Sequence, residues 1–157
     1  MRDLSLITSY NKIVYSLPYL CTMTKALGID FGMKRTGLAI TDDHRIIASP
    51  LAAVATDVLM TYLIQLFTKN KISTIVLGFP TSVDGTDTHI TENVRLLKEA
   101  LEKQFVGTEV ILQDERYTSQ RAMQVIHQGG KAKHKKDKGL VDTISATLIL
   151  QDYLAGV

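Results

Sequence analysis

The amino-acid sequence predicts an α/β fold in which a five-stranded mixed sheet is flanked by helices. Two observations lead to this expectation. Three strand-like segments joined by short turns come first, a pattern typical of an antiparallel meander. Apolar strand segments then alternate with amphipathic segments of helical period, a pattern typical of parallel strands linked by helices.

The meander is predicted from three short segments near the start of the chain. They read ALGIDF (26–31), TGLAIT (36–41) and RIIAS (45–49). The turn GMKR joins the first two, and Pro50 is expected to end the third, because proline cannot donate a hydrogen bond to a neighbouring strand.

The second half of the sheet is predicted from alternating segments. Asp57 is expected to cap a helix, and the nearly continuous apolar run at 73–79 is expected to be a central parallel strand. The remaining segments are a helix over 90–105, a strand over 109–113, a helix over 118–126 and a final helix over 140–154. This order of elements is that of the RNase H-like fold.

The length of 157 residues suits one domain with a sizeable core. We expect residues 23–157 to form that domain and residues 1–22 to be an extension, either ahead of a native start at Met23 or an arm that packs on the domain or a partner. No apolar run approaches the ~20 residues that span a membrane, so no membrane partner is expected. The lone Cys21 excludes an internal disulfide and fits a reducing cytoplasm.

Asp30 is the first candidate for chemistry. It stands in an apolar strand, where a carboxylate is costly to desolvate unless a cation or hydrogen-bond donors lie nearby. Gly28, Gly32 and Gly37 are expected to leave room for a phosphate to approach the backbone. The alternative is a turn aspartate that accepts hydrogen bonds from residues 32–35.

Asp142 stands near the start of the final helix, where the helix dipole alone would favour an acid. It shares a helix face with Ser145 and Ala146. These small side chains are expected to let the first turns pack closely on the sheet and bring Asp142 toward Asp30.

The third acid is expected from DER (114–116). Successive strand residues point to opposite faces, so Asp114 and Glu115 cannot both enter one site; Glu115 is the favoured residue and Asp114 the second choice. Carboxylates of Asp30, Glu115 and Asp142 are ligands suited to Mg²⁺ or Mn²⁺. Such a site activates water and stabilises the leaving oxygen of a phosphodiester, which predicts a metal-dependent endonuclease.

Basic residues border the predicted site. The net charge of +2 is too small to indicate nucleic-acid binding by itself, and most charge runs are solvated loops. A lysine-rich segment nevertheless leads directly into the helix of Asp142, where it would guide a phosphate backbone. The candidate substrate-binding residues are Lys131, Lys133, Lys135 and Lys136 of this segment, Lys34 and Arg35 of the first turn, and Arg116, whose alternative is pairing with neighbouring acids.

Several motifs in order resemble one known family. GIDFGMKRTGLAITD, LGFPTSVDG, NVRLLKEAL, DERYTSQRA and VDTISATLILQDYL are similar to the successive motifs of the YqgF family, also called RuvX, across residues 26–154. One departure concerns the site. In related resolvases the strand after the first helix ends with an acid, whereas here it ends LGFP.

The resemblance implies an RNase H-like fold, a bacterial cytoplasmic location and a nuclease that matures the 5′ end of precursor 16S rRNA. It implies catalytic acids at Asp30, in DER and at Asp142. The alternatives are a Holliday junction resolvase acting on four-way DNA, for which a homodimer would match the two-fold substrate, and a non-catalytic ribosome-assembly factor. An ATP-binding module of the actin and sugar-kinase class needs two such subdomains, and this chain has room for one.

Overall fold

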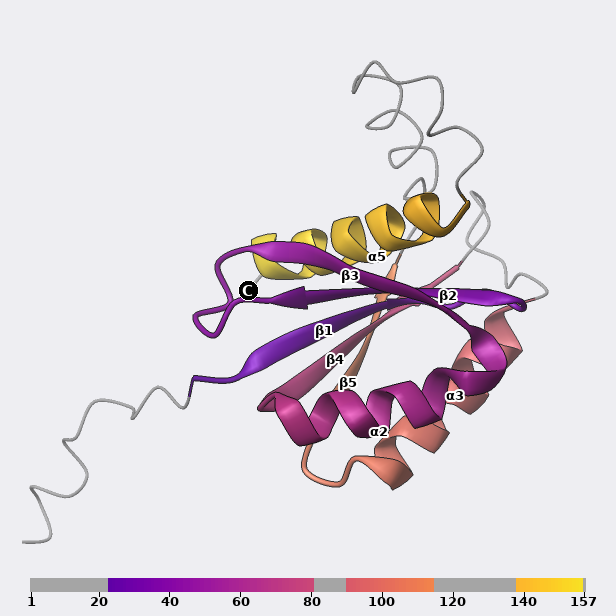
Figure 1. Ribbon diagram of the computed structural model, residues 1–157, viewed down its shortest axis with the longest axis horizontal. Helices are drawn as coiled ribbons and strands as arrows, with labels where there is room; N and C mark the ends of the chain where they lie inside the picture. The colour runs from indigo at the N-terminus through magenta and orange to yellow at the C-terminus, as the bar shows by residue number, and fades with distance from the viewer. Residues whose placement is uncertain (1–22, 81–89, 115–137, 157) are drawn as a thin grey trace, which may run out of the picture.

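A computed structural model describes residues 23–80, 90–114 and 138–156. Within these ranges five strands form one mixed sheet in the order β3-β2-β1-β4-β5, with helices on both faces (Figure 1). The predicted α/β architecture is therefore confirmed. No helix in the described ranges is long and apolar enough to cross a membrane.

The meander consists of β1 (Lys25–Asp30), β2 (Arg35–Thr41) and β3 (Ala48–Ala55). The first two strands lie where the sequence predicts them. The prediction for the third was wrong: β3 begins at Ala48 and continues through Pro50 instead of ending there. Pro50 is tolerated because β3 is an edge strand, and it pairs with Ala39 next to a shift in the register between β2 and β3.

Residues 42–47 form the turn before β3. The Asp42 carboxylate accepts hydrogen bonds from the backbone N–H groups of His44, Ile46 and Ile47, at 3.1, 2.8 and 2.7 Å. These bonds hold the pKa of Asp42 below its usual value. A turn stabilised by its own aspartate accounts for the late start of β3.

The expected cap at Asp57 is not formed. A short 3₁₀ turn, η1 (Thr56–Val58), contains Asp57 and precedes α2 (Leu59–Lys69). The residues at both N-cap positions, Ala55 and Val58, make no side-chain capping bond. Asp57 lies one residue inside the turn and contributes charge near a helix N-terminus without being the cap.

The remaining elements are β4 (Ile72–Phe79), α3 (Thr91–Gln104), β5 (Glu109–Asp114) and α5 (Lys138–Ala155). β4 is parallel to both β1 and β5 and is buried over most of its length, as its apolar sequence predicts. The predicted helix over 118–126 lies outside the described residues.

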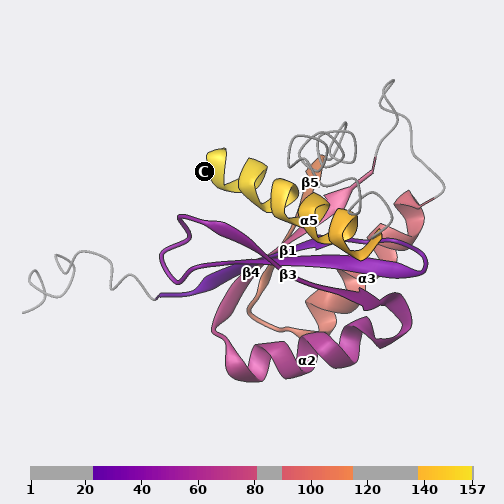
Figure 2. The same ribbon diagram turned by 45° about the horizontal axis from the view of Figure 1, so that its top comes forward.

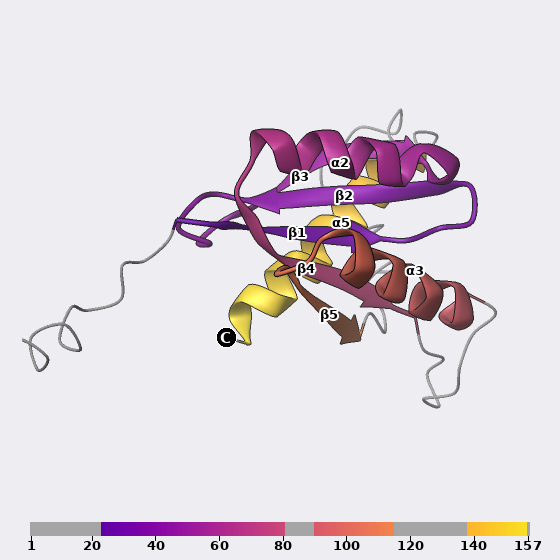
Figure 3. The same cartoon turned by 90° about the horizontal axis from the view of Figure 1, so that it is seen from below.

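The two faces of the sheet are covered differently. α2 and α3 lie on one face, and α5 crosses the other (Figures 1, 2 and 3). The first face holds large side chains such as Leu27, Leu63 and Leu101. The face under α5 holds a smaller cluster: Ala26, Ala39, Ala48, Val76, Ala146, Ile149 and Leu150.

Two glycines let α5 contact the sheet through backbone atoms. A Cβ atom at Gly37 would lie 1.9 Å from the Asp142 carbonyl oxygen, and one at Gly28 would lie 2.8 Å from the Ala146 carbonyl oxygen. Both distances are far below van der Waals contact, so no larger residue fits without moving the helix. We call Gly28 and Gly37 the glycine seat of α5.

Replacing Gly37 with alanine should displace the first turns of α5. Overpacking typically costs about 1–3 kcal/mol, and a clash with backbone places Gly37→Ala at the upper end. We therefore expect the free energy of unfolding, measured by urea denaturation, to fall by about 3 kcal/mol. Gly156→Ala is the matched control, since its new Cβ would make ordinary contacts at 3.7 Å. Equal stability of both variants would show that the glycine seat is not close-packed.

Candidate active site

The candidate site lies where the C-terminal end of β1 meets the first turns of α5. Asp30 is the last residue of β1 and pairs with Gly37 of β2. The backbone of Asp142 lies directly over Gly37. The structure thus brings together the two acids that the sequence predicted to converge from 112 positions apart.

The two carboxylates interact electrostatically. Burial and, after it, repulsion from the Asp142 carboxylate raise the pKa of Asp30, and a hydrogen bond with the Ser145 side chain lowers it; the net result is a pKa of about 6. Ser145 is buried, one turn along α5 from Asp142. A carboxyl group whose pKa is raised beside a second acid is a common feature of functional sites.

Arg35 binds the second acid. Its Nε donates to Asp142 Oδ2 at 3.0 Å, and the two side chains are 43% and 26% exposed. The sequence predicted Arg35 as a substrate contact; the structure shows its side chain bound to Asp142, a candidate metal ligand. Lys34 precedes it in the same exposed turn.

Threonines fix the turn that carries Arg35. Thr56 Oγ1 donates to the Gly32 carbonyl at 2.6 Å, and the Thr56 backbone N–H donates to the Lys34 carbonyl at 3.2 Å. The buried Thr36 hydroxyl lies 3.0 Å from the same Thr56 oxygen. These bonds hold residues 32–34 to Thr56, which directly follows β3. The backbone from which the Arg35 side chain extends is therefore fixed in place.

Sequence reasoning missed Thr36, Thr56 and the donor role of Ser145. The two threonines meet only because the register pairs Thr36 with Val54 near the end of β3. Ser145 was recognised for its small size alone. Its spacing of three residues from Asp142 was the available signal for a place beside the acids.

The predicted role of the glycines was wrong. Gly28, Gly32 and Gly37 were expected to leave room for a phosphate. At Gly28 and Gly37 that space is filled by the backbone and side chains of α5, and at Gly32 a Cβ atom would lie 2.5 Å from the Arg35 carbonyl oxygen. These glycines serve helix packing and a tight turn.

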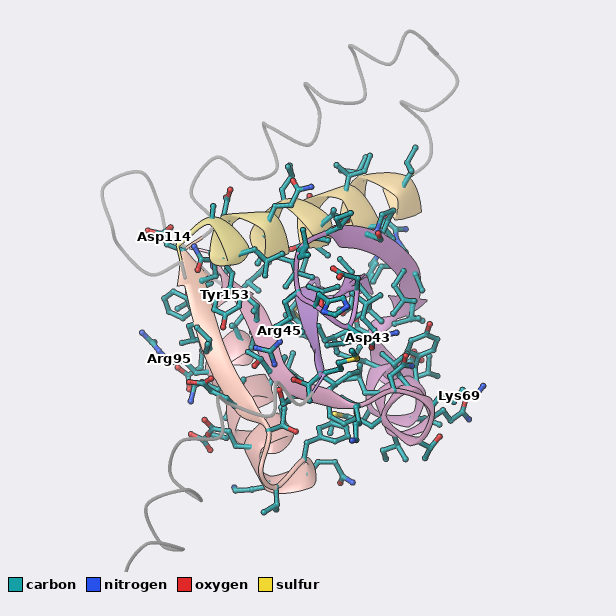
Figure 4. The ribbon with its side chains drawn as sticks, turned by 90° about the vertical axis from the view of Figure 1, so that its left-hand side faces the viewer. Asp43, Arg45, Lys69, Arg95, Asp114 and Tyr153 are labelled. Carbon is teal, nitrogen blue, oxygen red and sulfur yellow. The ribbon has the colours of Figure 1, made fainter. Side chains whose placement is uncertain are left out.

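Asp114 reaches the same edge of the sheet, because β1, β4 and β5 are parallel and end together. Figure 4 shows it at the end of β5. Side chains alternate between the two faces along β5, so Asp114 shares a face with Val110 and Leu112, which pack in the cluster under α2 and α3. Asp30 alternates with Gly28, which faces α5. Regular pleating therefore assigns Asp114 and Asp30 to opposite faces.

The remaining predicted site residues lie outside the described residues. They are Glu115, Arg116, Lys131, Lys133, Lys135 and Lys136. In the described ranges no group of three or more His, Cys, Asp or Glu side chains is placed to hold a metal ion. Asp30 and Asp142 supply carboxylate oxygens of the kind that Mg²⁺ and Mn²⁺ prefer, so the donor chemistry fits a divalent ion and requires further ligands.

Solved structures share this fold. Thermus thermophilus RuvC in complex with a Holliday junction substrate matches with a TM-score of 0.51 at 12% identity, over 84% of this chain and 96% of that one. A second structure of Thermus thermophilus RuvC matches with a TM-score of 0.50 over 85% and 96%. The chain thus has the same α/β fold, which is of the RNase H-like type.

The sequence comparisons define the family. Residues 24–156 match the RuvX family, described as "Holliday junction resolvase". Relatives described as "Putative pre-16S rRNA nuclease" include those of Flavobacterium psychrophilum, 40% identical over 84% of this chain and 97% of that protein, and Flavobacterium johnsoniae, 38% identical over 85% and 97%. A third, from Amoebophilus asiaticus, is 37% identical over 85% and 95%. The chain belongs to the RuvX family.

The raised pKa of Asp30 predicts that this acid destabilises the metal-free fold. The folded pKa of about 6 exceeds the usual unfolded value, so the fold favours the protonated form of Asp30. With respect to this group, the free energy of unfolding is therefore greatest in acid, and this advantage is lost as the pH rises through 6. At pH 8 the ionised Asp30 costs about 3 kcal/mol, since each pH unit between the two pKa values is worth about 1.4 kcal/mol.

Asp30→Asn should therefore melt at a higher temperature than the wild-type protein in EDTA at pH 8, and the difference should shrink toward pH 5. Thermal melts across this range measure it. The control is Asp57→Asn, which removes an exposed carboxylate elsewhere. A gain for Asp30→Asn that is constant with pH would contradict the assignment.

Proposed function

We propose that this chain is a metal-dependent endonuclease that hydrolyses phosphodiester bonds in the 5′-end maturation of precursor 16S rRNA. Membership of the RuvX family and the names of relatives that align over nearly their whole length support the substrate. The observation that supports the hydrolytic chemistry is the proximity of the Asp30 carboxylate, at the end of β1, to the Asp142 carboxylate, at the start of α5.

Asp30, Asp142 and Glu115 are the proposed ligands of Mg²⁺ or Mn²⁺. When bound, the ion supplies an activated water and neutralises charge on the leaving oxygen. Glu115 is preferred over Asp114 because alternation along β5 assigns Asp114 to the face opposite Asp30. Asp30 lies at the end of a strand and Asp142 on a helix, so the positions of these two acids do not depend on binding substrate.

The other predicted residues are proposed to contact the nucleic acid. Lys34 and Arg35 lie on the turn beside Asp142 and form one basic border of the site. Further phosphate contacts are proposed between Glu115 and Asp142 in the sequence, at Arg116, Lys131, Lys133, Lys135 and Lys136. These contacts position the backbone, whereas substrate identity depends on the shape of the nucleic acid.

A second candidate substrate is the four-way DNA junction. The family is described as a Holliday junction resolvase, and the fold matches that of RuvC solved with such a substrate. The two candidates share one hydrolytic reaction and differ in the nucleic acid that the basic border receives. A paired assay with both substrates distinguishes them.

We expect Asp30→Asn and Asp142→Asn each to abolish cleavage of a precursor 16S rRNA fragment in Mg²⁺ or Mn²⁺, by at least about a thousandfold, because each removes a charged ligand and keeps the side-chain volume. Asp57→Asn should cleave like the wild-type protein. Glu115→Gln should resemble the two site variants and Asp114→Asn should not.

The same variants are assayed on a four-way DNA junction. Cleavage of the RNA alone supports the maturation role, and cleavage of the junction alone supports the resolvase. Activity that persists in Asp30→Asn would contradict the assigned site and indicate a contaminating nuclease.

Replacing Lys131, Lys133, Lys135 and Lys136 with glutamine should weaken RNA binding and make it less dependent on salt. Each phosphate contact that is lost should reduce the slope of log affinity against log salt by roughly 0.7 for a single strand. Binding is measured in EDTA at several salt concentrations. Replacement of Lys69, Lys71, Lys98 and Lys103 provides the charge-matched control, and equal slopes for both sets would rule out the proposed contacts.

A further inference from the structure

We propose that Arg35 performs two tasks with one guanidinium group: its Nε positions Asp142, and its two Nη nitrogens bind a phosphate of the substrate beside the acids. This inference rests on the proposed function. It adds a positioning role to Arg35, and it makes this residue the physical link between substrate and candidate metal ligand.

The first task follows from the hydrogen bond that is present. Arg35 Nε lies 3.0 Å from Asp142 Oδ2, and the same contact is an ion pair. A donor on Oδ2 limits rotation of the carboxylate and leaves Oδ1 for a cation. Groups that orient metal ligands in this way are typically worth about 10–100-fold in metal affinity or activity.

The second task follows from the geometry of the guanidinium group. Arginine carries five N–H donors in a planar fork, and the bond to Asp142 uses only the one on Nε. The side chain is 43% exposed, and among the described residues Asp142 is its one acidic partner. Its Nη nitrogens are therefore available to the paired oxygens of a phosphate, which match the fork.

The backbone beneath Arg35 supports both tasks. Thr56 binds the carbonyl groups of Gly32 and Lys34, so the turn cannot drift relative to β3. From Arg35 onward β2 is paired with β3 on one side and, from Gly37, with β1 on the other. Arg35 thus projects from a fixed point toward the start of α5, which reduces the entropy lost when it binds a phosphate.

Two variants of equal side-chain length separate the tasks. In Arg35→Gln the amide nitrogen stands four bonds from Cα, as Nε does in arginine, so it still donates to Asp142 while the Nη nitrogens and the charge are lost. In Arg35→Met a methyl group stands at that position, and both tasks are lost. Comparing the two variants at equal charge isolates the bond to Asp142.

Both variants should bind a precursor 16S rRNA fragment in EDTA about tenfold more weakly than the wild-type protein, because both lose the phosphate fork. Arg35→Met should in addition bind Mn²⁺ about tenfold more weakly than Arg35→Gln in calorimetric titration without RNA, and its kcat should be lower by a similar factor. Both should melt near the wild-type temperature, since an exposed ion pair contributes little stability.

Lys34→Gln and Lys34→Met form the matched control pair. They remove the same charge from the same turn, at a side chain that makes no hydrogen bond with a described residue. The two Lys34 variants should therefore not differ from each other in Mn²⁺ affinity or kcat.

Equal Mn²⁺ affinity and equal kcat for Arg35→Gln and Arg35→Met would overturn the positioning task. Wild-type RNA affinity in both would overturn the phosphate task. If the wild-type protein cleaves neither RNA nor a four-way junction, the proposed function fails, while the Mn²⁺ and RNA affinities still decide the role of Arg35.

Discussion

The contact between the glycine seat and the backbone of α5 is the constraint on which the site depends. Carbonyl oxygens of Asp142 and Ala146 occupy the space that side chains would take at Gly37 and Gly28. A helix held off the sheet by ordinary side chains would stand several ångströms further away. The acid on its first turns would then be too far from Asp30 for one cation to join both, so the convergence of the two carboxylates is a consequence of backbone packing.

Holding two acids this close has an energetic cost, which the surrounding donors reduce. Ser145 bonds to Asp30 and Arg35 bonds to Asp142, so each carboxylate has a separate partner from a separate element. Burial and, after it, the repulsion that remains raise the pKa of Asp30. A divalent ion between the acids would remove that repulsion, and a pair of carboxylates arranged before the ion arrives is expected to bind it with little rearrangement.

The sequence predicted a five-stranded sheet made of an antiparallel meander and two parallel strands, and it predicted the convergence of Asp30 and Asp142, because both follow from periodicity and side-chain size. It failed where the outcome depends on strand register. Pro50 was expected to end a strand, but an edge position tolerates it. Gly28 and Gly37 were correctly taken to mark a close approach, but the approaching group is α5 and not a phosphate. Thr56 and Thr36 could not be paired before the register of β2 and β3 was known.

The two faces of the sheet divide stability from chemistry. The face under α2 and α3 is filled by large side chains such as Leu27, Leu63 and Leu101, which supply most of the apolar burial. The face under α5 is built largely from alanine and glycine, which bury less surface and allow a shorter distance between helix and sheet. A site that holds two repelling carboxylates together requires a short distance between helix and sheet more than it requires further apolar burial. The opposite face supplies the stability that small residues cannot. The end of β1 contributes to both faces: Ile29 packs in the large core that stabilises the fold, and the carboxyl group of the next residue, Asp30, faces α5 and the candidate site.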